Sequence, residues 1–181
     1  VDAAQAAGFE SIKLNAVLMR GINDDELEAM VDFVASRDLS LRFIEVMRTN
    51  DNAAFFAARH VAGQTVIDRL EVSGWTRLPR QPGAGPAIEL GHPSAKGRIG
   101  IIAPYSQDFC ASCNRLRLSS DGRLHLCLFG DGGIDLRPQL TGDDPAALLA
   151  RIRGLVATKA PAHRLHAGDS GATPHLASIG G

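Results

Sequence analysis

Three cysteines within one short stretch constrain this chain more than any other feature of its sequence. They are Cys110, Cys113 and Cys127, in the spacing C-x2-C-x13-C, and they are all the cysteines of the chain. Two thiols that are two residues apart can share one metal centre, because a tight turn brings their sulfurs together. A clustered, odd-numbered set is a poor disulfide framework and a better metal-binding set.

The residues before the third cysteine indicate how its thiol can return to the other two. Asp121-Gly122 is a strong hairpin turn signal between the runs 115–119 and 123–129. With these two residues as the turn, Cys127 lies opposite Leu116, within about 10 Å of chain from the C-x2-C pair. The sequence therefore predicts that three thiolates converge.

Three thiolate ligands leave the identity of the metal open. They are one fewer than a closed structural zinc site needs, and they suit a 4Fe–4S cluster with one iron free of protein ligands. His125 shares a strand face with Cys127 and could complete a Cys3His zinc site. Ordinary reduced core thiols are the third interpretation. An open metal position would serve substrate binding or chemistry.

Arg115 and Arg117 alternate with Leu116 and Leu118 directly after the C-x2-C pair. In a strand, this alternation puts both guanidinium groups on one face and directs the leucines into a core. Two arginines beside an open metal position form a fork that suits phosphate or carboxylate. A solvated face of an antiparallel sheet is the simpler interpretation of the same pattern.

The composition is that of an ordinary globular protein. The length is enough for one domain or one and a half. The chain has 181 residues, of which 45% are hydrophobic and 22% charged, and its net charge is −1. We therefore expect neither nucleic acid nor an anionic membrane as a partner, and no apolar run is long enough for a membrane span. Clustered thiols without a signal peptide favour a reducing, cytoplasmic setting, and a homodimer is left open.

Residues 1–48 have the pattern of a parallel βαβ unit, with strands expected at 11–19 and 39–47 and an amphipathic helix at 24–37. Residues 23–26 resemble a capping box at the start of that helix.

Polar side chains interrupt the two predicted strands. Lys13 and Asn15 share one face of the first strand, and Arg42 lies in the second. In a barrel covered by helices, such residues face the lumen or its catalytic rim. On pattern alone, they are more simply surface residues at strand ends.

Beyond residue 48 the pattern becomes that of a smaller α+β region. Short helices are expected at 63–74 and 145–158, and short strands at 75–78, 87–90 and 98–103. Together with the cysteine hairpin, these strands suggest a small antiparallel sheet, and His92 is expected as an exposed loop residue. From Lys159 the chain lacks periodicity, so we expect an extended or disordered tail.

The cysteine stretch as a whole, CASCNRLRLSSDGRLHLCLF, resembles the C-terminal cluster motif of the GTP 3′,8-cyclases of molybdenum cofactor biosynthesis. These are radical S-adenosylmethionine (SAM) enzymes. IKLNAVLMRGINDDE and LRFIEVM are similar to the last two strand regions of the cyclase barrel, and that family also ends in a double glycine. The resemblance covers nearly the whole chain.

The resemblance implies an α/β fold that consists of the last part of an incomplete radical-SAM (β/α) barrel and a small α+β cap with an antiparallel sheet. The barrel part would be residues 1–48, the cap with its auxiliary cluster 49–158, and an extended tail 159–181. Barrels need about 250 residues, and the C-x3-C-x2-C motif that holds the SAM-cleaving cluster is absent. We therefore expect this chain to be the C-terminal half of a cyclase and to be inactive alone.

The resemblance also implies a role for individual residues. Cys110, Cys113 and Cys127 would hold a 4Fe–4S cluster whose open iron takes the substrate. GTP would be bound by Lys13, Arg42, Arg115, Leu116 and Arg117, SAM by the backbone of Met47, and the tail would bring Gly180 and Gly181 into the active site.

The implied reaction converts GTP to (8S)-3′,8-cyclo-7,8-dihydroguanosine 5′-triphosphate, with SAM and a second 4Fe–4S cluster bound by the missing N-terminal half. Two alternatives compete with this hypothesis. One is a zinc- or cluster-stabilised binding module without enzymatic activity, and the other is a different radical SAM enzyme with an auxiliary cluster.

Overall fold

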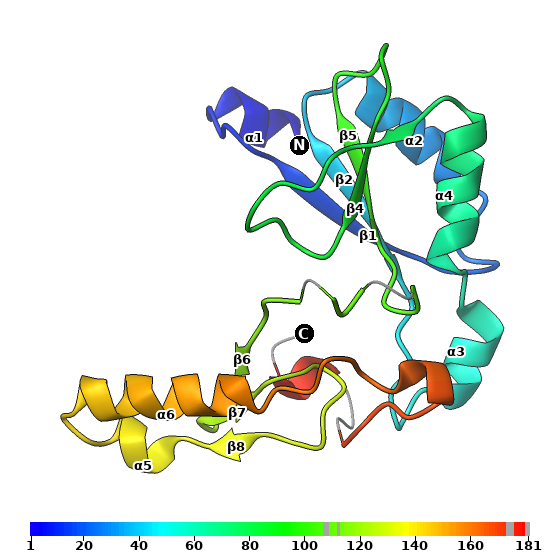
Figure 1. Cartoon of the computed structure of the whole chain (residues 1–181). Coiled ribbons are helices and arrows are strands. Elements are labelled where there is room, and N and C mark those ends of the chain that lie inside the picture. Colours follow the sequence, from blue (N-terminus) through cyan, green and yellow to red (C-terminus); the bar gives the residue numbers. More distant parts are fainter. Residues whose placement is uncertain (107–108, 112, 173–175, 180–181) are drawn as a thin grey trace. The chain divides into compact units, whose positions relative to one another are not determined.

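The computed structural model of the chain describes residues 1–106, 109–111, 113–172 and 176–179. The chain divides into two compact units (Figure 1). Unit 1 consists of Val1–Met47 and Ala54–Phe109, and unit 2 consists of Arg48–Ala53 and Cys110–Gly181. Each unit has its own sheet.

Unit 1 is built on a mixed sheet of five strands in the order β1-β2-β5-β4-β3. The strands are β1 (Lys13–Leu18), β2 (Ser40–Glu45), β5 (Arg98–Ile102), β4 (Ile88–Gly91) and β3 (Thr76–Arg77). β1, β2 and β5 run parallel to one another. β4 pairs antiparallel with β5, and β3 pairs antiparallel with β4. The expected α/β class and the expected parallel βαβ unit are thereby confirmed, and the five strands form an open sheet.

Two helices cover one face of this sheet. α2 (Leu27–Ala35) connects β1 to β2, and α4 (Gly63–Val72) precedes β3 (Figure 1). The shorter α1 (Asp2–Ala6) and α3 (Ala53–Arg59) precede β1 and α4. The residues that α2, α4 and the strands bury together form one apolar core, which includes Leu27, Val34, Phe43, Ile67, Leu70, Trp75, Leu90, Ile99 and Ile101. Strand residues that alternate with these core positions point to the other face.

The start of α2 differs from the predicted capping box. The helix begins at Leu27, and its N-cap residue Glu26 makes no capping hydrogen bond with its side chain. The side chain of Asn23 instead accepts the N–H of Met19 at 2.8 Å and donates to the carbonyl of Val17 at 3.1 Å. The predicted box was therefore wrong, because Asn23 closes the loop after β1 instead of capping the helix.

Unit 2 contains a separate antiparallel sheet in the order β6-β7-β8. Its elements are β6 (Arg117–Leu118), β7 (Arg123–His125), β8 (Ile134–Asp135), α5 (Arg137–Leu140) and α6 (Pro145–Ala157). Leu124, Leu136 and Leu155 form its small buried core. The expectation that the hairpin joins one small sheet with all the short strands was wrong, because β3, β4 and β5 extend the sheet of unit 1.

The cysteine hairpin closes with a longer loop than its predicted turn. Leu118 pairs with Leu124, so residues 120–122 form the loop, which ends in a glycine with φ of +77°. A three-residue hairpin loop of this kind has its left-handed glycine at the last position. The added residue moves the register by one position, so the predicted location of Cys127 opposite Leu116 was wrong.

The described part of the segment after α6 packs into unit 2. It contains two short 3-10 helices, η1 (Leu165–Ala167) and η2 (Leu176–Ile179), and buries Leu165 and Ile179 to 4% exposure. The N–H of Ala172 donates to the carbonyl of Gly130 at 2.9 Å. The sequence pattern did not indicate this packing.

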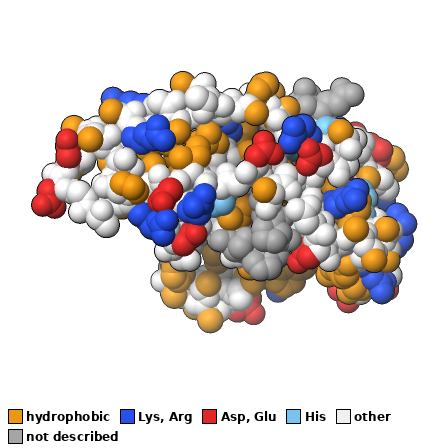
Figure 2. All heavy atoms as spheres, turned by 90° about the horizontal axis from the view of Figure 1, so that it is seen from below, with side chains coloured by type: hydrophobic (Ala, Val, Ile, Leu, Met, Phe, Trp, Pro, Cys, Tyr) orange, Lys and Arg blue, Asp and Glu red, His pale blue; other side chains and the backbone are white. Residues whose placement is uncertain are grey.

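The surface carries both signs of charge. On the face that Figure 2 shows, lysine and arginine side chains are interspersed with aspartate and glutamate, in keeping with the net charge of −1. None of the helices in the described ranges is long and apolar enough to cross a membrane.

Candidate functional site

The sheet of unit 1 carries polar side chains on the face opposite α2 and α4, at the start of its parallel strands. Residues in register on neighbouring parallel strands point to the same side of a sheet. Two such rows lie on this face, namely Lys13, Ser40 and Arg98, and then Asn15, Arg42 and Gly100. The sequence prediction that Lys13 and Asn15 share a face is therefore confirmed, and Arg42 lies on that same face.

Lys13 and Arg42 line one pocket of about 430 Å³, together with Glu89 and Arg98. Arg42 Nη2 lies 3.9 Å from Glu89 Oε1. Within the described part of the chain, the buried Nε of Arg42 has no hydrogen-bond partner. A Cβ at Gly100 would lie 3.2 Å from Arg42 Cγ, so the glycine leaves room for the aliphatic part of that side chain. Sequence reasoning missed Glu89 and Arg98, because the pairing of β5 and β4 with this sheet is non-local.

A buried carboxyl group, paired with a half-buried imidazole, occupies the carboxyl end of β2. Glu45 is 5% exposed, and its Oε1 lies 2.6 Å from Nε2 of His60. The N–H groups of Gly63 and Tyr105 also donate to the carboxyl group. Burial raises the pKa of Glu45, although these hydrogen bonds oppose the effect. Met47, the predicted SAM contact, is half-buried two residues beyond Glu45.

In unit 2, the three cysteines occur as free thiols. The charges of Cys110 and Cys113 each act to raise the pKa of the Cys127 thiol. In the described ranges, no three His, Cys, Asp or Glu side chains are positioned to hold a metal ion. Convergence of the three sulfurs on one metal centre therefore stays a prediction.

Two of the sulfurs accept a backbone hydrogen bond from the residue two positions later. Phe129 N–H donates to Cys127 Sγ at 3.4 Å, and Arg115 N–H donates to Cys113 Sγ. Sulfurs that bind iron receive hydrogen bonds of this kind, which also tune the potential of the cluster. The donor set of this segment therefore fits an iron–sulfur centre.

The surroundings of the thiols differ in their effect on ionisation. Burial raises the pKa of the Cys127 thiol above its ordinary value. Burial also raises the pKa of Cys113, but the N–H of Arg115 and the ammonium of Lys159 outweigh it, so that this pKa lies below its ordinary value.

His125, the predicted fourth ligand of the zinc alternative, is the last residue of β7 in the small sheet. It lies opposite Arg117, and a Cβ at Gly133 would lie only 2.6 Å from His125 Nε2. Burial lowers the pKa of this imidazole. The ring nitrogen is thus directed at the backbone just before β8.

The residues predicted to contact GTP in unit 2 lie on and beside β6. Arg115 and Leu116 are exposed, and Arg117 is half-buried. Leu116 is 40% exposed and Leu118 is 54% exposed, so the expectation that these leucines enter a core was wrong. The reason is that β6 is a two-residue edge strand, and the apolar core of unit 2 lies under β7 and α6.

Lys159 is a residue of this region that sequence reasoning did not identify. Its ammonium donates to the carbonyls of Arg115 and Cys113, at 2.9 and 3.2 Å, and lies 3.4 Å from Cys113 Sγ. It stands 46 residues from Cys113 in the chain, so no motif spacing could have indicated the contact. Gly180 and Gly181, the predicted tail contacts, lie outside the described residues.

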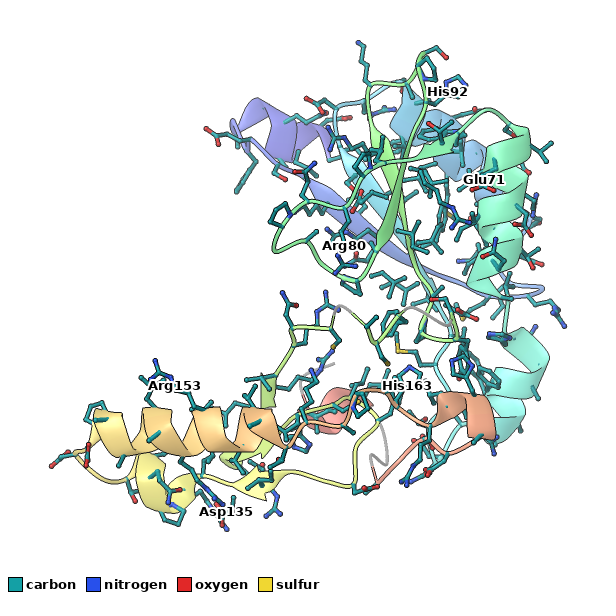
Figure 3. All side chains as sticks on the ribbon, in the orientation of Figure 1. Glu71, Arg80, His92, Asp135, Arg153 and His163 are labelled. Carbon is teal, nitrogen blue, oxygen red and sulfur yellow. The ribbon has the colours of Figure 1, made fainter. Side chains whose placement is uncertain are left out.

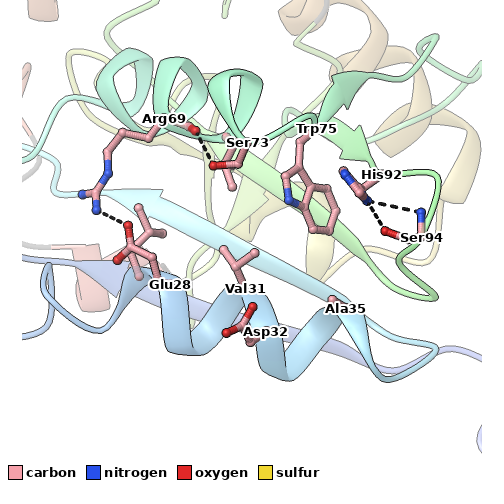
Figure 4. A pocket seen from close by; sticks show the side chains of 11 residues that line it. Glu28, Val31, Asp32, Ala35, Arg69, Ser73, Trp75, His92 and Ser94 are labelled. Carbon is pink, nitrogen blue, oxygen red and sulfur yellow. Dashed lines mark hydrogen bonds and ion pairs between the residues drawn. The ribbon is translucent and has the colours of Figure 1, made fainter.

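A further pocket of about 300 Å³ lies on the helix-covered side of unit 1 (Figure 4). Trp75, His92 and Ser94 line one side of it, and the ion pair of Arg69 with Glu28 lies on the other. His92 is half-buried, with its ring 5.6 Å from that of Trp75, instead of extending into solvent as expected. None of the predicted site residues lines this pocket.

Comparison with known proteins gives one family and a consistent set of relatives. A family model described as "Molybdenum Cofactor Synthesis C" matches residues 39–165. A GTP 3′,8-cyclase of Stenotrophomonas maltophilia (strain R551-3) is 56% identical over 179 residues, which cover 98% of this chain and 55% of the relative. A GTP 3′,8-cyclase of Aeromonas hydrophila is 50% identical over 182 residues, and one of Yersinia pestis is 48% identical. These cover 100% of the chain and 53% and 56% of the two relatives. The chain thus spans about half the length of the curated relatives it matches.

Proposed function

The chain belongs to the Molybdenum Cofactor Synthesis C family, and we propose that it forms the substrate-binding, C-terminal portion of a GTP 3′,8-cyclase. The observation that carries this proposal is the group of three free thiols in unit 2, two of which accept hydrogen bonds from the backbone N–H groups of Arg115 and Phe129. In the proposed reaction, the complete enzyme converts GTP to (8S)-3′,8-cyclo-7,8-dihydroguanosine 5′-triphosphate with SAM as the radical source.

We propose that Cys110, Cys113 and Cys127 hold a 4Fe–4S cluster. When bound, the cluster supplies one iron without a protein ligand, which can coordinate a ring atom of guanine. The thiols provide the ligands, and the N–H groups of Arg115 and Phe129 hold two of the sulfurs in place. The chain's own part is thus to fix the position of that open iron.

The cationic side chains bind and orient the nucleotide in this proposal. Arg115 and Arg117 offer planar guanidinium groups that can contact phosphate at two points. Lys13 and Arg42 supply two further cations from their pocket in unit 1. The exposed side chain of Leu116 can contact the apolar face of a base. Each of these cations can neutralise phosphate charge or fix the intermediate.

The remaining parts of the proposal concern the complete enzyme. Residues 1–48 would complete a radical-SAM barrel with preceding strands, and the polar face with Lys13 and Arg42 would line its lumen. Met47 would contact SAM through its backbone, and the tail 159–181 would bring its terminal glycines to the substrate. A reducing, cytoplasmic setting is part of the proposal because the thiols must stay reduced.

The proposal is tested by nucleotide binding to the anaerobically reconstituted chain. We expect Arg115→Ala and Arg117→Ala each to weaken GTP binding by about 10- to 150-fold, because a charge-assisted contact contributes roughly 1.5–3 kcal/mol. Arg→Lys should restore little, since lysine cannot make the planar two-point contact. Arg151→Ala, an exposed change on α6, is the matched control. Wild-type affinity in both arginine variants would remove them from the site.

The division of labour between the two halves is tested separately. We expect the 181-residue chain alone to release no 5′-deoxyadenosine from SAM under reducing, anaerobic conditions, because it lacks the C-x3-C-x2-C motif. Addition of an N-terminal half in trans should restore some release if the halves associate. Release by this chain alone at the rate of a complete enzyme would contradict the proposal.

The alternative function, a zinc-stabilised binding module, predicts a colourless protein that contains zinc and no sulfide. The cyclase portion predicts a brown protein that contains iron and sulfide.

A further inference from the structure

A lysine that the proposed function does not use lies directly after α6. The helix ends at its C-cap residue Thr158, and the N–H of the next residue, Lys159, donates to the carbonyl of Val156 at 3.1 Å. Lysine near a helix C-terminus often interacts with the last carbonyls of its own helix. The ammonium of Lys159 instead reaches a different segment of unit 2.

An ammonium group has three N–H donors, and three acceptors surround this one. They are the carbonyl of Arg115 at 2.9 Å, the carbonyl of Cys113 at 3.2 Å and Sγ of Cys113 at 3.4 Å. β6 begins only at Arg117, so residues 113 and 115 precede the ladder of the small sheet. Lys159 therefore supplies hydrogen-bond partners that secondary structure does not provide for these carbonyls.

Lys159 contacts both a proposed cluster ligand, Cys113, and a proposed nucleotide-binding residue, Arg115. Its contacts hold the backbone carbonyls on both sides of residue 114. They therefore fix the direction in which the side chains of Cys113 and Arg115 extend from the backbone. The positive charge of Lys159 also acts to lower the pKa of the Cys127 thiol. A single cation thus contacts one of the three thiols and favours the thiolate form of a second.

We propose that Lys159 is a positioning residue of the thiolate centre: it holds segment 113–115 in place and directs a positively charged N–H donor at the sulfur of Cys113. This inference rests on the proposed function, in which Cys113 is a cluster ligand. A hydrogen bond and a positive charge at a ligating sulfur stabilise the more negative, reduced form of a cluster. Lys159 should therefore raise the reduction potential of the bound cluster as well as order the segment.

The test compares Lys159→Met with Lys159→Arg in the full 181-residue chain after anaerobic reconstitution with iron and sulfide. Methionine keeps most of the length of the side chain and removes its charge and donors, whereas arginine keeps both. The matched control is Arg153→Met, which removes one positive charge from an exposed position on α6 (Figure 3). The readouts are the reduction potential of the cluster and the rate of iron release to a chelator.

In Lys159→Met, we expect the reduction equilibrium to shift toward the oxidised cluster by about tenfold, which is 59 mV for a one-electron couple. Iron release should be faster in the same variant. Lys159→Arg should recover most of both properties, and Arg153→Met should change neither. If Lys159→Met holds no cluster, Lys159→Gln keeps an N–H donor without the charge, and its potential should fall below that of the wild-type chain.

A cluster-loaded Lys159→Met or Lys159→Gln with the wild-type potential would overturn the inference, even if its thermal stability were lower, because a merely structural lysine would leave the potential unchanged. Such a result would leave the proposed function standing. A wild-type chain that binds no iron–sulfur cluster would instead contradict the proposed function itself.

Discussion

Removal of the buried carboxyl group of Glu45 should strongly destabilise unit 1. Three groups hydrogen-bond to it: Nε2 of His60 at 2.6 Å and the donating N–H groups of Gly63 and Tyr105. A buried donor left without an acceptor costs about 1–3 kcal/mol. Because the His60 side chain is 25% exposed, water can replace its partner there, which leaves the N–H groups of Gly63 and Tyr105 without their acceptor. We therefore expect Glu45→Ala to lower the free energy of unfolding by about 3–5 kcal/mol.

The single tryptophan of the chain makes this change measurable for unit 1 alone. Trp75 is 4% exposed and belongs to the apolar core of that unit, so its fluorescence reports the unfolding of this core in urea. Glu45→Gln keeps one acceptor oxygen and should lose less stability than Glu45→Ala. Glu89→Ala is the matched control, because its carboxylate lies on the open face at 3.9 Å from Arg42 and should contribute at most about 1 kcal/mol.

The reasoning would be refuted if Glu45→Ala lost no more stability than Glu89→Ala. That outcome would mean that water reaches the donors around residue 45, and that the pair is not a buried polar centre.

Three further predictions concern stability. Burial raises the pKa of Glu45 above its ordinary 4.5, so the folded state keeps a proton that the unfolded state releases; the urea midpoint of unit 1 should therefore fall as the pH rises above that value, and less so in Glu45→Gln. Gly97→Ala should destabilise unit 1 by about 3 kcal/mol in the same assay, since a Cβ would lie 2.6 Å from the carbonyl oxygens of Val34, Arg37 and Leu39. Asp144→Ala should destabilise unit 2 by about 1 kcal/mol, measured by circular dichroism in urea, because the N–H groups of Ala146 and Ala147 lose their 3.0 Å capping acceptor.

The local sequence pattern was sufficient to predict those helices and strands whose hydrophobic periodicity lies within their own residues. The helical spacing of α4 and α6 and the βαβ unit of β1, α2 and β2 were predicted and are present. The partners of the short strands were not predictable in this way. β5 is one apolar run that could join any sheet, and only the tertiary structure places it beside β2.

The hairpin register was missed for a related reason. Asp121-Gly122 allows a two-residue turn, but the same glycine can also end a three-residue loop with a left-handed conformation. The choice depends on how the small sheet packs and not on the turn residues. Lys159 and His60 were missed because their partners lie 46 and 15 residues away, where no spacing rule applies.

The metal content of the chain tests the central claim most directly. After anaerobic reconstitution with iron and sulfide, followed by removal of unbound metal, we expect about four irons and four sulfides per chain. Cys110→Ala, Cys113→Ala and Cys127→Ala should each lose most of this iron, because two thiolates cannot retain the cluster. One tightly bound zinc per chain without sulfide, or full iron loading in Cys127→Ala, would contradict the claim that these three cysteines hold a 4Fe–4S cluster.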